Sequence, residues 1–138
     1  MNKIMSFRTI ICFFICYVSL ISCSDDESFS KSKLIGTWRQ YVQEEYDLDW
    51  ELLREDYYSE ELTFREDGTY LDSGSTPRSW RLNGNKLTIV RRDEVEVYRI
   101  KSLTADELVL KYVWEDQAYN DYYTGHHYIC KYHRISDD

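Results

Sequence analysis

The chain contains 138 residues, of which 17 are Lys or Arg and 25 are Asp or Glu, so its net charge is −8. This length fits one domain, and the low content of glycine (5) and proline (1) excludes collagen-like and linker-like chains. Aromatic residues make up 16% of the chain, and Tyr alone occurs 13 times, which predicts a packed core. The acidic balance argues against a nucleic-acid partner, because phosphate binding needs clustered Lys and Arg.

The N-terminus has the organisation of an export signal. Lys3 and Arg8 form a positive region ahead of an uncharged apolar run over residues 10–21. This run is shorter than the ~20 apolar residues of a membrane span. The run ends in Leu-Ile-Ser-Cys at residues 20–23, which resembles the lipobox of bacterial lipoproteins. This resemblance implies a signal peptide over residues 1–22 and a lipid on Cys23 that attaches the chain to a membrane. The alternative is an ordinary secretory signal with a chance cysteine.

Residues 23–33 are polar and charged, which predicts a disordered tether. The order Cys-Ser-Asp-Asp-Glu at residues 23–27 resembles the surface-export signal of lipoproteins from the Bacteroides group, although a plain solvated linker explains it equally. The resemblance implies a place in the cell envelope, at the outer membrane and exposed on the cell surface. Cleavage and acylation would leave Cys130 without a partner, so we expect no disulfide and a fold stabilised by its core.

From residue 34 onward, apolar and polar residues alternate with a period of two, which is typical of strands with one buried face. Leu108, Leu110 and Tyr112, for example, share one face. Eight strands are predicted, over residues 34–46, 60–66, 69–72, 78–82, 86–91, 94–101, 107–114 and 126–134.

The connections between these strands alternate between tight and long. Tight turns are predicted at residues 67–68, 83–85 and 103–107. Longer connections cover residues 47–59, 73–77 and 115–125. Because alternate connections of an up-and-down meander lie at the same end, the tight turns gather at one end and the long loops at the other. We therefore predict an all-β fold, an eight-stranded antiparallel up-and-down β-barrel over residues 34–138 that is closed at one end.

Several short segments resemble one family. Residues 34–38, Leu-Ile-Gly-Thr-Trp, resemble the Gly-x-Trp signature of lipocalin-like proteins. Further matches follow at residues 62–70, 80–82, 87–89 and 100–110. Together they resemble the lipocalin-like domain of small Bacteroides-group lipoproteins, over about residues 34–134. The resemblance implies that Trp38 packs across the closed end beneath Arg134, as structural residues. Gly36 would let a backbone or ring approach closely.

The sequence contains no recognisable catalytic constellation. Nucleophilic catalysis needs Ser, Cys or Thr with a His and an orienting acid, but no Gly-x-Ser-x-Gly occurs, and Cys130 is predicted as a small core residue. His126 and His127 would point to opposite faces of one strand, so no metal site is predicted. Paired carboxylates such as Glu44 and Glu45 are expected in solvated rims and turns. We expect neither catalysis nor a cofactor, with an enzyme or an enzyme inhibitor as a third alternative.

Aromatic residues of the loops and the inner wall are the candidate binding residues. Trp50, Leu53 and Tyr57 have a spacing compatible with a short amphipathic helix within residues 47–59, capped by Asp49. The other candidates are Tyr58, Tyr70, Trp80, Tyr98, Tyr112, Trp114, Tyr119, Tyr122 and Tyr123. Such rings combine apolar faces with hydrogen-bonding tips, which suits recognition. Alternatively, they plug the barrel mouth and complete the core.

These observations predict a lipid-anchored, non-enzymatic binding protein of the cell envelope. It would hold a small apolar or aromatic molecule, a sugar or a peptide at the open end of the barrel. The alternative is an interaction or structural subunit of an envelope complex, with a filled barrel. The predicted partners are the membrane, through the lipid on Cys23, and an unidentified small molecule or envelope protein.

Overall fold

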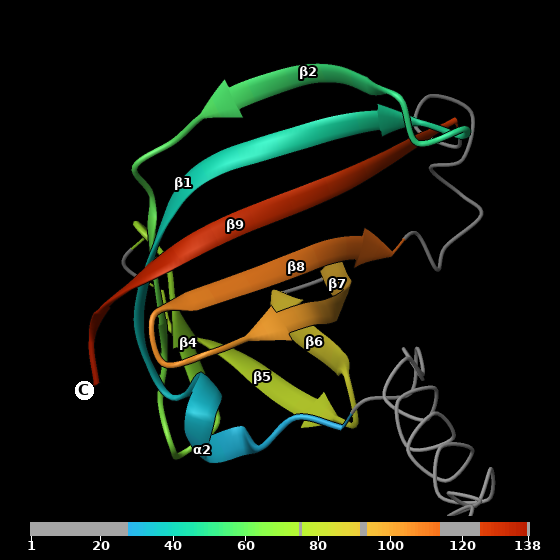
Figure 1. The fold of residues 1–138 in the computed structure, drawn as a ribbon. Coiled ribbons are helices and arrows are strands. Elements are labelled where there is room, and N and C mark those ends of the chain that lie inside the picture. The colour runs from blue at the N-terminus through green and yellow to red at the C-terminus, as the bar shows by residue number, and fades with distance from the viewer. Residues whose placement is uncertain (1–27, 75, 92–93, 114–124, 138) are drawn as a thin grey trace, which may run out of the picture.

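The computed structural model describes residues 28–74, 76–91, 94–113 and 125–137. Their main element is an antiparallel sheet that curls into a barrel (Figure 1). The strands are β1 (Gly36–Asp47), β2 (Leu52–Tyr57), β3 (Glu61–Phe64), β4 (Thr69–Leu71), β5 (Arg78–Asn83), β6 (Lys86–Arg91), β7 (Glu94–Leu103), β8 (Glu107–Val113) and β9 (His126–Ser136). One helical turn, α2 (Lys31–Leu34), precedes β1.

The strand order confirms the predicted antiparallel up-and-down barrel. From β3 to β9 each strand pairs with the next in sequence, and β1 pairs with both β3 and β9, which closes a ring of eight strands. β2 is a ninth strand, which the sequence pattern did not predict. Within the described ranges, no helix is long and apolar enough to cross a membrane.

β2 and β3 lie one after the other along the same edge of β1. β3 pairs with residues 36–39 and β2 with residues 42–46. Between them, the N–H of Gln40 donates to the carbonyl of Glu60 at 2.8 Å, so the ladder is nearly continuous. β4 pairs with β3 and not with β2. Among the described strands, β2 therefore has β1 as its one neighbour and keeps a free edge.

The short helix considered for residues 47–59 is wrong. One carboxylate oxygen of Asp47 accepts the N–H groups of Asp49 and Glu51, both at 2.9 Å, and Trp50 adopts a left-handed φ of 64°. These contacts reverse the chain in a tight turn, as an Asp side chain does when it hydrogen-bonds the backbone that follows it. After the turn, residues 52–57 run back along β1 and pair with it as β2. This strand pairing outweighs the weak helical spacing of Trp50, Leu53 and Tyr57.

The prediction for the two ends of the barrel is confirmed for the tight turns. Of the expected long loops, residues 47–59 instead contain β2, and residues 115–124 lie outside the described residues. The tight turns lie at the end that α2 covers, where the N–H of Phe29 donates to the carbonyl of Gly84 at 3.1 Å and the Lys31 ammonium donates to the carbonyl of Glu66 at 3.3 Å. We call this the closed end. The turn between β1 and β2 and the start of β9 lie at the other end, which we call the open end (Figure 1). Residues 28–33, expected in the tether, thus contact the barrel, and Phe29 packs against the core.

The core fills the half of the barrel next to the closed end. It comprises Leu34, Trp38, Leu62, Phe64, Tyr70, Trp80, Leu87, Ile89, Ile100, Leu103, Leu108, Leu110, Cys130 and Tyr132. Trp38 is fully buried, and its indole N–H donates to the carbonyl of Leu34 at 2.9 Å. Phe64 meets Trp80 edge to face, with ring centroids 5.4 Å apart. The closed half therefore has a packed apolar interior, so we look for a binding site in the open half.

Candidate functional site at the open end

A bulge in β1 decides which side chains face the inside of the open half. The register with β9 shifts between Gln40 and Val42, so Tyr41 is an extra residue. Before the bulge, the even-numbered residues of β1 face the core. After it, Gln43 and Glu45 face inward instead, since one extra residue reverses the alternation.

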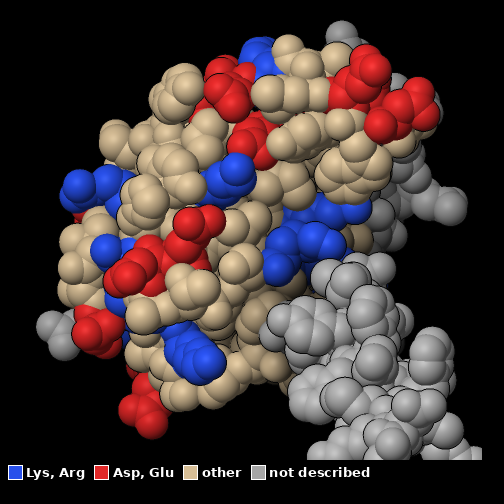
Figure 2. Space-filling view, in the orientation of Figure 1, with Lys and Arg blue, Asp and Glu red and all other residues tan. Residues whose placement is uncertain are grey.

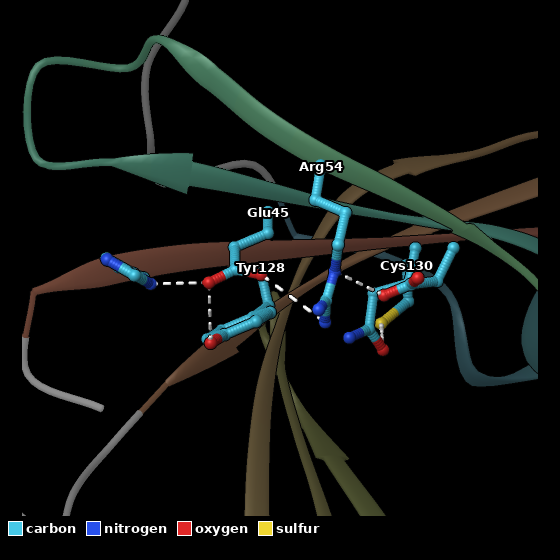
Figure 3. Close-up of polar contacts among 7 residues, drawn as sticks. Glu45, Arg54, Tyr128 and Cys130 are labelled. Atoms are coloured by element: carbon cyan, nitrogen blue, oxygen red, sulfur yellow. Dashed lines mark hydrogen bonds and ion pairs between the residues drawn. The ribbon is translucent and has the colours of Figure 1, made fainter. Parts of the chain in front are cut away.

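The inward-facing residues after the bulge meet polar residues of β2 and β9. We call the group the inner polar cluster; it comprises Gln43, Glu45, Arg54, Asp56, His126, Tyr128 and Cys130 (Figure 3). These side chains point toward one another between β1, β2 and β9 in Figure 3. Three strands thus contribute to one polar site on the inner face of the barrel.

Glu45 is the centre of the inner polar cluster. Its Oε1 lies 2.5 Å from Nδ1 of His126 and accepts the hydroxyl of Tyr128 at 3.2 Å. Its Oε2 lies 3.5 Å from the guanidinium of Arg54, whose Nε is 2.9 Å from a carboxylate oxygen of Asp56. Four groups from two other strands therefore converge around one carboxylate, either directly or through Arg54.

The cluster is graded from buried to exposed. The side chain of Glu45 is 14% exposed, whereas those of His126 and Arg54 are 41% and 62% exposed. A molecule arriving at the open end would therefore meet His126 and Arg54 before it met the carboxylate. Because these two side chains are exposed, they can turn toward such a molecule without unfolding the barrel.

Neutral hydrogen-bonding groups lie deeper in the barrel. The Cys130 thiol donates to the side-chain oxygen of Gln43 at 3.6 Å, and burial raises the pKa of this thiol to about 11. Burial also raises the pKa of the Tyr98 phenol, with a smaller contribution from Glu96, to which its hydroxyl donates at 3.3 Å. Tyr98 contacts Tyr112 edge to face at 5.1 Å. At neutral pH these groups stay protonated and act as donors.

Gln40 places an unsatisfied donor on the same inner face. Its side chain belongs to a residue that is 7% exposed, and its Nε2 has no hydrogen-bond partner in the described part of the chain. Leaving a buried donor unpaired costs about 1–3 kcal/mol. A water or a ligand acceptor inside the barrel would remove this cost.

The outer face of the open end carries a separate aromatic cluster. Trp50 stacks on His127 at 4.0 Å, and the Lys111 ammonium lies 4.6 Å from the centre of the indole. Burial lowers the pKa of His127, and the neighbouring Lys111 lowers it further. His126 and His127 thus face opposite sides of β9, as the alternation predicted.

The predicted binding residues fall into separate places. Tyr70 and Trp80 lie in the core of the closed half, 2% and 5% exposed. Tyr98 and Tyr112 pair with each other, and Trp50 lies on the outer face. Leu53, Tyr57 and Tyr58 are exposed on or beside β2. The remaining candidates, Trp114, Tyr119, Tyr122 and Tyr123, lie outside the described residues.

Sequence reasoning missed most of the inner polar cluster. It placed Glu44 and Glu45 on a solvated rim, but their side chains are 10% and 14% exposed. Arg54 and Asp56 were assigned to a loop and turn out to lie on β2. The missing signal was the bulge at Tyr41, because the residue pairs that reveal it belong to strands far apart in sequence.

A hollow of about 450 Å³ lies at the closed end between α2, two tight turns and the C-terminal residues. Arg134 lines it and lies 4.1 Å above the ring of Trp38. Its guanidinium donates to the carbonyls of Ala105 (2.6 Å), Ile35 (2.8 Å) and Lys33. With its donors used in this way, Arg134 fastens β9 to the chain before β1 and has little left for a ligand.

A protein-family model matches the sequence. Residues 34–110, more than half of the chain, match the model of the lipocalin-like domain. No curated protein and no solved structure matches the sequence. Within the described ranges, no three or more His, Cys, Asp or Glu side chains are grouped so that they could hold a metal ion.

Proposed function

Since the chain belongs to the family of lipocalin-like domains, we propose that it is a non-enzymatic binding protein that takes a small ligand into the open end of its barrel. The observation that carries this proposal is the inner polar cluster. It joins a packed apolar half to the open end, and its donors and acceptors are partly exposed there. Binding pockets of this kind combine an apolar wall with a few placed polar groups.

The chemistry of the cluster favours a sugar or a short peptide over a purely apolar ligand. Arg54 offers exposed N–H donors, Glu45 and Asp56 offer acceptors, and the second ring nitrogen of the exposed His126 can make a further hydrogen bond. A ligand without polar groups would leave these side chains desolvated and unpaired, which opposes binding. A sugar or peptide supplies both partners, and the unpaired Nε2 of Gln40 would favour one further acceptor deeper in the barrel.

We also propose that a lipid on Cys23 anchors the barrel in the cell envelope, at the outer membrane. The support is the sequence of residues 10–23, with its apolar run and lipobox-like end. Metabolic labelling with a radioactive fatty acid tests this. We expect label on the wild type and none on Cys23→Ser; label on both variants would overturn it.

A second candidate is an interaction subunit of an envelope complex. The supporting observation is the cluster of large exposed apolar residues at and after the β1–β2 turn. These are Leu48, Trp50, Leu52, Leu53, Tyr57 and Tyr58, each at least 40% exposed. Exposed apolar groups gathered in one place are typical of binding surfaces.

Native mass spectrometry of the protein from cells that produce it is the first test. A bound molecule of a few hundred daltons would support the binding role, and a stoichiometric protein partner would favour the second candidate. Thermal shift measurements with mono- and disaccharides and di- and tripeptides follow. We expect a hit whose shift is lost in Glu45→Gln.

The matched control is Glu61→Gln, which removes an equally charged group from an exposed outer ion pair with Arg39. It should keep the ligand-dependent shift. A shift that survives in Glu45→Gln as well would place the ligand away from the inner polar cluster and overturn the proposed site.

A further inference from the structure

The free edge of β2 presents backbone groups that no described strand satisfies. The N–H of Tyr58 donates to the carbonyl of Tyr41 at 3.3 Å. In an antiparallel pair, the residues that face the neighbour alternate with those that face away. The backbone N–H and C=O groups of Glu55 and Tyr57 therefore point away from β1, toward the free edge.

β2 is also exposed on both of its faces. Five of its six residues are exposed, including Leu52 (49%), Leu53 (51%) and Tyr57 (77%). An unpaired edge with apolar side chains on its strand is a template for another strand. A strand added here would gain backbone hydrogen bonds and apolar contacts above and below the sheet.

Charge selects the kind of strand that fits. Residues 44–60 contain eight acidic residues and one basic residue, Arg54. Figure 2 shows acidic side chains gathered over the end of the molecule where β1 turns into β2. Two copies of this edge would bring like charges together, which is unfavourable. A positively charged segment would find complementary charge on the same surface.

We propose that the free edge of β2 binds an extended, basic segment of a partner protein, which adds to the sheet as a tenth strand. The segment would alternate Lys or Arg with aliphatic residues. Its backbone pairs with Glu55 and Tyr57, and its side chains contact Leu52 and Leu53 or the surrounding carboxylates. This surface lies on β2 and does not depend on ligand binding inside the barrel.

The test uses the full chain and a fluorescein-labelled peptide, Lys-Val-Lys-Val-Lys-Val-Lys, followed by fluorescence polarisation. We expect saturable binding that weakens with salt. A Glu-Val analogue should bind at least tenfold more weakly. A peptide with proline in place of its central valine should also bind at least tenfold more weakly, because proline cannot donate to the ladder. No saturable binding of the Lys-Val peptide, or equal binding of all three peptides, would overturn the proposal.

Glu55 provides a matched pair of variants. Glu55→Pro removes the outward N–H at an edge position, where proline is tolerated, and Glu55→Ala removes the same charge but keeps the N–H. We expect a loss of at least tenfold in affinity for Glu55→Pro and less than threefold for Glu55→Ala. Equal losses would mean that charge alone attracts the peptide, which would overturn strand addition.

Three measurements separate this proposal from its competitors. Hydrogen exchange should show that the peptide protects the amides of Glu55 and Tyr57, which holds even if Glu55→Pro fails to fold. Glu45→Gln removes one charge and should change the peptide affinity by less than threefold, so a failed ligand site and a failed edge site give different results. A dimer in sedimentation experiments that Glu55→Pro abolishes would assign the edge to a second copy and overturn the proposal.

Discussion

Strands β1 and β9 run through both halves of the barrel and have a different role in each. In the closed half, the inner residues of β1, β3 and β9 form an apolar core around Trp38 and Phe64, both fully buried. In the open half, β1, β2 and β9 carry the inner polar cluster around Glu45, and β2 has a free edge. One half is closed on all sides, and the other leaves polar side chains and backbone groups available.

The difference between the halves comes from one inserted residue and one early turn. The bulge at Tyr41 turns Gln43 and Glu45 inward, and the Asp47 turn starts β2 where a loop was expected. A strand can therefore contribute to a core along one part and to a binding site along another. The following four predictions test this division, from the largest expected effect to the smallest.

Replacing a tryptophan should be costly in the closed half and cheap in the open half. Trp38→Ala removes a fully buried indole, so we expect the free energy of unfolding to fall by about 3–5 kcal/mol. Trp50→Ala removes a half-exposed indole, and the loss should be about 1 kcal/mol or less. Urea denaturation measures both. Similar losses for the two variants would contradict the division.

Two glycines with positive φ should also differ. A Cβ on Gly36 would lie 2.5 Å from the guanidinium of Arg134 and 2.6 Å from the carbonyl of Ser136, whereas a Cβ on Gly84 would have no atom within 4 Å. We expect Gly36→Ala to lower the free energy of unfolding by about 2–3 kcal/mol. Gly84→Ala should lower it by about 1 kcal/mol, through its backbone conformation alone. The reverse order in thermal denaturation would contradict the close approach at Gly36.

The ion pair between Glu44 and Lys131 should make stability depend on pH. Burial opposes ionisation of Glu44, but hydrogen bonds from Lys131 and Tyr46 outweigh it and hold its pKa below the ordinary value. The bond to Glu44 raises the pKa of Lys131. The pair should therefore stabilise the fold fully between about pH 5 and pH 10. This stabilisation should fade as pH falls through the folded pKa of Glu44, or rises through that of Lys131.

Glu44→Gln measures this contribution. Near pH 7 we expect its free energy of unfolding to be about 1–2 kcal/mol lower than that of the wild type, as for a lost hydrogen bond to a charged group. The difference should shrink toward pH 3 and pH 11. A difference that stays constant across this range in urea denaturation would contradict the pKa shifts.

The smallest effect concerns Cys130, which lies where the two halves meet. Its residue is 6% exposed, and its pKa of about 11 leaves little thiolate at pH 8. We expect iodoacetamide to modify it much more slowly in the native protein than in urea, as mapped by peptide mass spectrometry. Equal rates would show that the interior around the inner polar cluster opens freely to reagents.

Much of the fold was predictable because alternation and turn chemistry are local. The eight predicted strands all occur, with ends displaced by a few residues, and the tight turns gather at one end as expected. β2 was not predictable, because five of its six residues are exposed and its sequence shows no clear alternation. The inner polar cluster was not predictable either, since it depends on pairing between β1 and β9 and on a bulge that only this pairing reveals.

The ladder between β1 and β9 also determines at which stage of folding the inner polar cluster can form. Each other ladder among the described strands joins segments that are closer in sequence, but Glu44 and Lys131 are 87 positions apart. We expect contacts between such distant residues to form late in folding, after the local hairpins, because closing a long loop costs entropy. Glu45 meets His126 and Tyr128 only through this ladder. We therefore expect closure of the ring to be the step that assembles the polar site, so a partly folded chain would have strands but no complete inner polar cluster.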